Sequence, residues 1–146
     1  MRNKIIIAVA CVLVGCSQQP VTLTSSAAAT PWDSIANGRA IFQTGKDLRG
    51  VQIVAQSRPL FNKCSACHRA DGSGGMRLSN AVVSADLRHR ALVVEQKHPY
   101  TLPLLERAIA TGVDNEGQKL NPMMPRWKLS QQDLHDVAQY VLQKLK

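Results

Sequence analysis

Apolar residues near the end of the chain recur three or four positions apart, which is the spacing of one face of an α-helix. The stripe consists of Leu134, Val137, Ala138, Val141, Leu142 and Leu145, with Tyr140 beside it. Ser130 and Asp133 have the spacing of a capping box, so the helix is expected to start at Ser130. The pattern predicts an amphipathic helix whose apolar face packs against a core.

A second helix is predicted around residue 40. Asp33 or Ser34 can cap its start by accepting a hydrogen bond from a free backbone N–H group, and Gly45 can end it. The apolar face of this helix consists of Ile35, Gly38, Ile41 and Phe42. A glycine on that face allows another helix to approach closely.

A third helix is predicted between Thr101 and Gly112. Thr101 is the expected N-cap, Pro103 fits the first helical turn, and Gly112 closes the helix. The residues expected to face the core are Leu104, Leu105, Ala108 and Ile109. Three helices without a series of strands predict an all-α domain over residues 32–146.

Two segments lack a clear helical pattern. Within residues 46–60, the stretch VQIVA fits one strand of a short hairpin or a packed loop. Within residues 76–99, a turn of helix is expected in the stretch SADLRHRAL. The pattern leaves the rest of both segments open.

The N-terminal segment has the pattern of an export signal. A basic start precedes an apolar run over residues 5–14, which is too short to span a bilayer. The run ends in LVGC at residues 13–16, which resembles the lipobox of bacterial lipoproteins. That resemblance implies that residues 1–15 are a signal peptide and that Cys16 is lipidated. The alternatives are an uncleaved short anchor, or a plain signal peptide that is cut near residues 27–29.

Charge and composition narrow the choice of partners. Residues 16–31 are small and uncharged, as expected of a flexible tether between the lipid and the domain. Removal of Arg2 and Lys4 with the signal peptide lowers the net charge from +8 to +6. The remaining basic residues are scattered and not interleaved with aromatic residues, which argues against a nucleic-acid partner. A mildly basic surface suits an acidic protein partner, although an ordinary soluble surface would look the same.

The chemistry of the chain is concentrated in the motif Cys64-x-x-Cys67-His68. A structural zinc site needs four ligands, and the sequence has no second C-x-x-C and no H-x₃₋₅-H pair. A thioredoxin-like dithiol belongs to a β/α pattern, which this sequence does not have. The motif instead predicts a c-type haem with thioethers to both cysteines and His68 as an axial iron ligand. The low aromatic content of 4% also suits a domain in which a cofactor fills part of the core.

A second axial ligand is expected from the stretch LNPMMPRWKLS. Met123 and Met124 lie between two prolines, which stiffen the loop, and Trp127 can cover the edge of the haem. Met76 lies too close to the haem motif and is interpreted as a loop or core residue. Three histidines could replace methionine in a bis-His haem: His89, His98 and His135.

The stretches CSACHRADGSGG (64–75) and LNPMMPRWKLS (120–130) together resemble the class I cytochromes c of bacteria, over roughly residues 32–146. The resemblance implies a small all-α fold in which the N- and C-terminal helices cross around one covalently attached haem c. It also implies a glycine/aromatic contact at the crossing, where the matching residues are Gly38, Phe42 and Tyr140.

The resemblance also implies roles at the haem. The ligand in this family is the methionine directly before the proline, so Met124 is the expected ligand and Met123 the runner-up. A backbone carbonyl after the haem motif is expected to accept a hydrogen bond from His68. Arg69 departs from the family, which often has a small residue there.

The expected function is transfer of single electrons, not enzymatic catalysis, because a haem ligated by His68 and Met124 has no open position for a small-molecule substrate. Expected partners are redox proteins: an oxidase, a dehydrogenase or a cytochrome complex. The alternative is a haem c enzyme, or a sensor of gas or peroxide, with a displaceable methionine. The expected location is the bacterial cell envelope, facing the periplasm, with Ser17 after the lipidated cysteine slightly favouring the outer membrane.

Overall fold

The computed structural model describes residues 32–57 and 59–146. The predicted signal peptide (1–15), and the predicted lipidated Cys16 with its tether (16–31), lie outside the described residues. Within the described ranges, no helix is long and apolar enough to cross a membrane.

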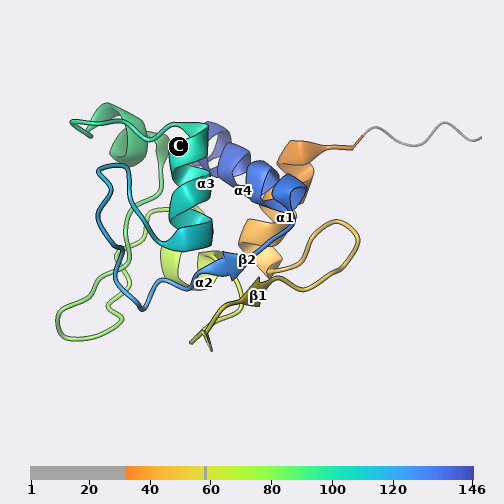
Figure 1. The fold of residues 1–146 in the computed structure, drawn as a ribbon, viewed down its shortest axis with the longest axis horizontal. Coiled ribbons are helices and arrows are strands. Elements are labelled where there is room, and N and C mark those ends of the chain that lie inside the picture. The colour runs from red at the N-terminus through yellow and green to blue at the C-terminus, as the bar shows by residue number, and fades with distance from the viewer. Residues whose placement is uncertain (1–31, 58) are drawn as a thin grey trace, which may run out of the picture. The chain divides into compact units, whose positions relative to one another are not determined.

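Helices dominate the described part of the chain, and two very short strands form its sheet (Figure 1). In chain order the elements are α1 (Ser34–Thr44), β1 (Val54–Ala55), α2 (Ser65–His68), η1 (Arg90–Val94), α3 (Leu102–Thr111), β2 (Trp127–Lys128) and α4 (Gln131–Lys144). Here η1 is a five-residue π-helix. The predominance of helices confirms the predicted all-α class.

The three long helices begin at the predicted signals, and α1 and α3 also end at the predicted glycines. Asp33 caps α1 by accepting a hydrogen bond from the Ala36 N–H (2.9 Å), and Gly45 ends α1 with φ 75°. Ser130 caps α4 by accepting a hydrogen bond from the Asp133 N–H (3.1 Å). The third helix follows Thr101 and ends at Gly112, as predicted, although the Thr101 side chain makes no capping bond.

Helices α1 and α4 cross, as Figure 1 shows for the orange and blue helices. A Cβ atom on Gly38 would overlap the backbone carbonyl of Asp136, so glycine is needed for the close approach. The rings of Phe42 and Tyr140 pack with centroids 5.7 Å apart. Asn37, which is fully buried, donates from Nδ2 to carboxylates of α4. The predicted crossing is confirmed, and this buried polar contact adds to it.

The core lies between these helices and α3. Its buried members include Ile41, Phe42, Leu92, Leu105, Ile109, Trp127, Val137, Val141 and Leu145. Of the residues predicted to face the core from α3, Leu105, Ala108 and Ile109 are buried. Leu104 is only partly buried and lies outside the core cluster.

The two irregular segments differ from the simplest predictions. The stretch VQIVA pairs locally at Gln52, which forms an isolated antiparallel bridge with Lys46, but its strand β1 pairs elsewhere: Val54 and Ala55 lie antiparallel to Lys128 and Trp127. The pairing partner therefore lies about seventy residues away in the sequence, where local patterns cannot reveal it. In SADLRHRAL, the helical turn lies only at the end, where η1 begins at Arg90, and residues 84–87 form neither helix nor strand.

Candidate functional site

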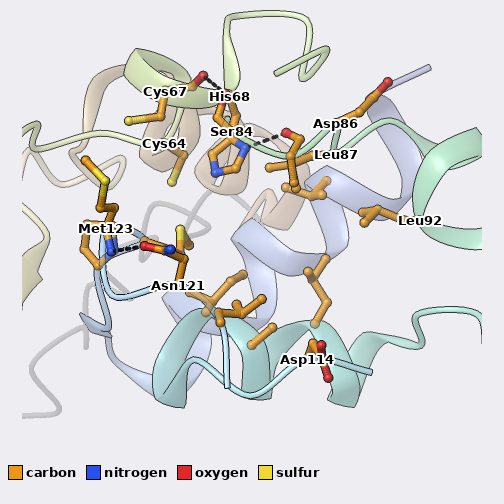
Figure 2. Close-up of a pocket in the computed structure, with 18 of the residues that line it drawn as sticks. Cys64, Cys67, His68, Ser84, Asp86, Leu87, Leu92, Asp114, Asn121 and Met123 are labelled. Atoms are coloured by element: carbon orange, nitrogen blue, oxygen red, sulfur yellow. Dashed lines mark hydrogen bonds between the residues drawn. The ribbon is translucent and has the colours of Figure 1, made fainter. Parts of the chain in front are cut away.

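The motif residues meet at a single cavity. Helix α2 is one turn, closed by a hydrogen bond from the His68 N–H to the Cys64 carbonyl (3.0 Å). Cys64, Cys67 and His68 all line a cavity of about 380 Å³ (Figure 2). One helical turn thus brings the three motif side chains to the same space.

The methionine loop forms another part of the cavity wall. Met123 and Met124 both line it, and Figure 2 shows Asn121 and Met123 on a segment apart from α2. The loop turns tightly, because the Met124 N–H donates to the Asn121 carbonyl (3.0 Å) and the Met123 N–H donates to Asn121 Oδ1 (3.0 Å). Met124 packs against the core cluster, whereas Met123 does not belong to that packing. This difference favours Met124 as the inward-facing methionine.

Most of the remaining wall is apolar. It comes from all the long helices and includes Phe42, Leu87, Leu92, Leu105, Ile109, Trp127 and Val141. Trp127 lines the cavity and is buried in the core. The cavity therefore offers a largely apolar lining of the kind that binds an apolar group.

The ring of His68 is held by a bond to the backbone. Its Nδ1 donates to the Ala85 carbonyl (2.9 Å), because a carbonyl oxygen can only accept, and Nε2 is then the nitrogen left to bind iron. Burial lowers the pKa of His68, and the bond to Ala85 opposes that change only in part. The imidazole is therefore neutral at pH 7, which is the form that binds a metal.

Ser84 and Gly74 position the Ala85 carbonyl. The Ser84 hydroxyl accepts a hydrogen bond from the Met76 N–H (2.9 Å) and donates one to the Cys67 carbonyl (2.8 Å). A Cβ atom on Gly74 would overlap the Ala85 carbonyl, so only glycine permits this approach. Sequence reasoning did not find Ala85 or Ser84, because any residue can supply a backbone carbonyl. The closely spaced glycines of DGSGG were the available signal.

The other histidines lie away from this wall. Among the described residues, His68 is the only histidine that lines the cavity. His89 Nδ1 contacts the Leu142 carbonyl (3.1 Å), His98 pairs with Glu116 (3.2 Å), and His135 pairs with Glu106 (3.0 Å). The arrangement gives no support to a bis-His haem.

The structure does not favour the two competing uses of the cysteines. Burial raises the pKa of Cys64 to about 12 and also raises the pKa of Cys67, whereas a redox dithiol depends on a lowered thiol pKa. The described part of the chain contains no group of three or more His, Cys, Asp or Glu residues placed to hold a metal ion. A protein-only zinc site is therefore not formed there.

Fold and site together define a small haem-binding helical protein. The family model of cytochrome c matches residues 35–144, and the chain therefore belongs to the cytochrome c family. A comparison with curated proteins finds no match. Members of this family bind haem c covalently and use it for electron transfer, and the helix-dominated fold is that of a small class I cytochrome c.

The residues present fit a haem. Two thiols that are free of any disulfide and a neutral imidazole line an apolar cavity, and a thioether sulfur is available from another part of the wall. Cys64 and Cys67 would form the two thioether bonds, and His68 would bind the iron. These are the positions that the sequence predicts.

Proposed function

We propose that this chain is a bacterial monohaem cytochrome c, lipid-anchored on the periplasmic face of a membrane, which passes single electrons between redox proteins. The proposal rests above all on one observation: Cys64, Cys67, His68 and Met124 line the same apolar cavity. When bound there, the haem supplies a one-electron iron couple.

The chain's own residues would tune that couple. The bond from His68 to the Ala85 carbonyl fixes the orientation of the imidazole and increases its basicity. Met124 would provide a thioether as the second axial ligand, and methionine favours reduced iron relative to a second histidine. The apolar wall keeps water away and so limits rearrangement on electron transfer. With both axial positions taken by the chain, a carrier is favoured over an enzyme.

The cavity opens beside exposed apolar side chains, where a partner could make contact. Leu60, Phe61 and Val83 line the cavity and are 68%, 44% and 54% exposed. Lys63 also lines the cavity and is exposed. A small apolar patch with a basic neighbour suits brief complexes with an acidic redox protein, such as an oxidase, a dehydrogenase or another cytochrome.

The membrane anchor is proposed from the sequence of residues 1–31. The lipid on Cys16 would keep the domain at the membrane, and residues 17–31 would let it move between donor and acceptor. Ser17 slightly favours the outer membrane.

The first test is the optical spectrum of oxidised and reduced protein, for the wild type, Met124→Ala and Met123→Ala. We expect a weak sulfur-to-iron band at the red end of the oxidised spectrum, which Met124→Ala removes and Met123→Ala keeps. Loss of the band in Met123→Ala alone would move the ligand by one residue and leave the function intact. A wild-type protein without the band, with a high-spin spectrum that shifts on addition of carbon monoxide, would favour the haem enzyme or sensor.

A further inference from the structure

One arginine side chain binds the methionine loop from within. The guanidinium of Arg126 donates from Nη1 to the carbonyls of Asn121 (3.1 Å) and Met124. From Nη2 it donates to the carbonyls of Leu120 (2.8 Å) and Gly112 (3.5 Å). The four acceptors belong to the end of α3 and to the loop that carries both methionines.

The number of donors matches the number of acceptors. Each terminal nitrogen of a guanidinium has two hydrogens, so Nη1 and Nη2 can serve four carbonyls in one plane. A lysine ammonium has three hydrogens around one atom and cannot reproduce this fork. The arrangement is therefore specific for arginine at position 126.

The backbone makes room for this side chain. Gly112 ends α3 with φ 69°, and a Cβ atom there would overlap Nε of Arg126. The Arg126 carbonyl accepts a hydrogen bond from the Gln56 N–H (2.7 Å), next to the pairing of β1 with β2. The backbone of Arg126 is thus hydrogen-bonded beside the β1–β2 pair, and its side chain extends from there into the loop.

The charged guanidinium of Arg126 donates its hydrogen bonds to backbone carbonyls. No carboxylate of the described residues forms an ion pair with it. Hydrogen bonds from a charged donor are stronger than bonds between neutral groups, and no acidic partner competes for these. The side chain is therefore free to act as a support for the loop.

We propose that Arg126 is a positioning residue that holds loop 112–125 closed over the cavity and so keeps Met124 at the iron. The second part of the inference rests on the proposed ligation by Met124. The first part concerns only the loop, and it can be measured whichever residue is the ligand.

The test uses the full-length haem-loaded protein with three variants. Arg126→Lys keeps the charge and loses the fork, whereas Arg126→Gln loses both. Lys119→Gln is the matched control, because it removes one charge from an exposed residue of the same loop. Two properties are measured: hydrogen exchange of the Leu120 and Met124 amides, and binding of added imidazole to the oxidised haem.

Both Arg126 variants are expected to speed exchange of the Leu120 and Met124 amides by about tenfold or more, the equivalent of about one charged hydrogen bond. These amides bond to the carbonyls of Gly112 and Asn121, which Arg126 also holds. Imidazole binding should strengthen by a similar factor as the sulfur-to-iron band weakens, while Lys119→Gln changes neither property. The amide of Gly45, in a distant helix cap, should exchange as in the wild type and so report an intact fold.

Two results would separate failure of this inference from failure of the proposed ligation. Unchanged exchange at both amides in Arg126→Gln would overturn the role of Arg126, whatever the spectrum shows. Absence of the sulfur band from the wild type would overturn ligation by Met124. Faster loop exchange in the variants would still support the role of Arg126 in holding the loop. Full recovery of wild-type exchange in Arg126→Lys would show that charge is enough and would overturn the need for the fork.

Discussion

The two loops that line the haem cavity are held in different ways. The loop behind His68, residues 72–87, is fixed by backbone bonds: the Gly75 N–H to the Ser84 carbonyl (2.9 Å) and the Leu87 N–H to the Gly72 carbonyl (2.7 Å). The methionine loop, residues 112–125, also has backbone bonds, such as that of the Leu120 N–H to the Gly112 carbonyl (2.8 Å), but the Arg126 side chain adds bonds to four carbonyls there. The histidine loop is thus held largely by bonds within itself, whereas the methionine loop also depends on a side chain from outside it, which can rotate away.

This difference suits the two ligands. A histidine is bound strongly by iron, and its ring orientation depends on a fixed acceptor, here the Ala85 carbonyl. A methionine thioether is a weaker donor and needs a loop that keeps it in place. The comparison predicts that an added Cβ costs more at Gly74, where it meets the Ala85 backbone, than at Gly112, where it meets the Arg126 side chain.

Gly74→Ala should have the largest effect. Gly74 has φ 60°, and an added Cβ would overlap the Ala85 carbonyl, a backbone atom that cannot move aside cheaply. We expect a loss of about 3 kcal/mol in the free energy of unfolding, together with a change in midpoint potential as the bond to His68 is displaced. Denaturant unfolding and redox titration measure the two effects.

The matched control for that change is Gly75→Ala. Gly75 also has positive φ (75°), but the nearest atom to its added Cβ is Arg69 Nη2, at 3.8 Å. Only the backbone penalty of about 1 kcal/mol is expected, with an unchanged potential. Equal losses for the two variants would show that the Ala85 contact contributes nothing.

Gly112→Ala should have a smaller effect on stability. Its added Cβ would overlap the guanidinium of Arg126, which is the end of a flexible side chain and can move. We expect a loss of about 2 kcal/mol in the free energy of unfolding. It combines the penalty for positive φ with the weakened hydrogen bonds of Arg126. The variant should also bind added imidazole more tightly than the wild type.

Gly117→Ala separates the two contributions at Gly112. Gly117 has φ 85° in the same loop, and its Cβ would meet no atom within 4 Å. A loss of about 1 kcal/mol without any change in imidazole binding is expected. If Gly112→Ala behaved in the same way, the guanidinium would not be supporting the loop.

The sequence predicted the parts of this molecule that local rules determine. The caps at Asp33 and Ser130 and the helix ends at Gly45 and Gly112 depend on a few neighbouring residues, and all lie where expected. The haem motif is also local, because one helical turn brings its three side chains together.

The remaining features depend on contacts between distant residues. Pairing of β1 with β2, the acceptor at Ala85 and the four bonds of Arg126 all use backbone groups, which every residue type can supply. A sequence cannot indicate which carbonyl is used. Arg126 is visible in the sequence as the neighbour of the methionine loop, but the carbonyls around it appear only in the fold.

Ser84→Ala tests the support of the histidine side with a smaller expected loss of stability than Gly74→Ala. The change leaves the Met76 N–H and the Cys67 carbonyl without their hydroxyl partner. Because both groups are partly buried, we expect a loss of about 1–2 kcal/mol, measured by denaturant unfolding. Ser79→Ala is the control, since that residue is exposed in the same loop and should change stability by less than about 0.5 kcal/mol. A loss in Ser84→Ala no larger than that of the control would exclude the hydroxyl as a support.

Acid should have the smallest of the predicted effects on stability. Between the two sides of the cavity, the effect should fall on the histidine side. Hydrogen bonds from the Arg88 side chain hold the pKa of Asp86 below its ordinary value of 3.8. A carboxylate with a lowered folded-state pKa stabilises the fold above its unfolded-state pKa. That contribution is lost as the pH falls through the folded-state value. Acid should therefore loosen the segment around Asp86 before it loosens the hydrogen bonds of Arg126, whose acceptors are all backbone carbonyls.

Hydrogen-exchange protection on each side of the cavity can measure this. The amide of Leu87 reports on the histidine side and the amide of Leu120 on the methionine side, each corrected for the intrinsic effect of pH. In the wild type, protection of Leu87 should fall below about pH 4 while that of Leu120 changes less. Asp86→Asn should reduce the acid-dependent part at Leu87, because the side chain at position 86 no longer titrates, while Asp71, whose pKa is lowered by hydrogen bonds from Ser73, still does. If protection fell equally at both amides and Asp86→Asn did not alter the fall, the two loops would loosen as one unit in acid. The contrast between the loops would then hold only at neutral pH.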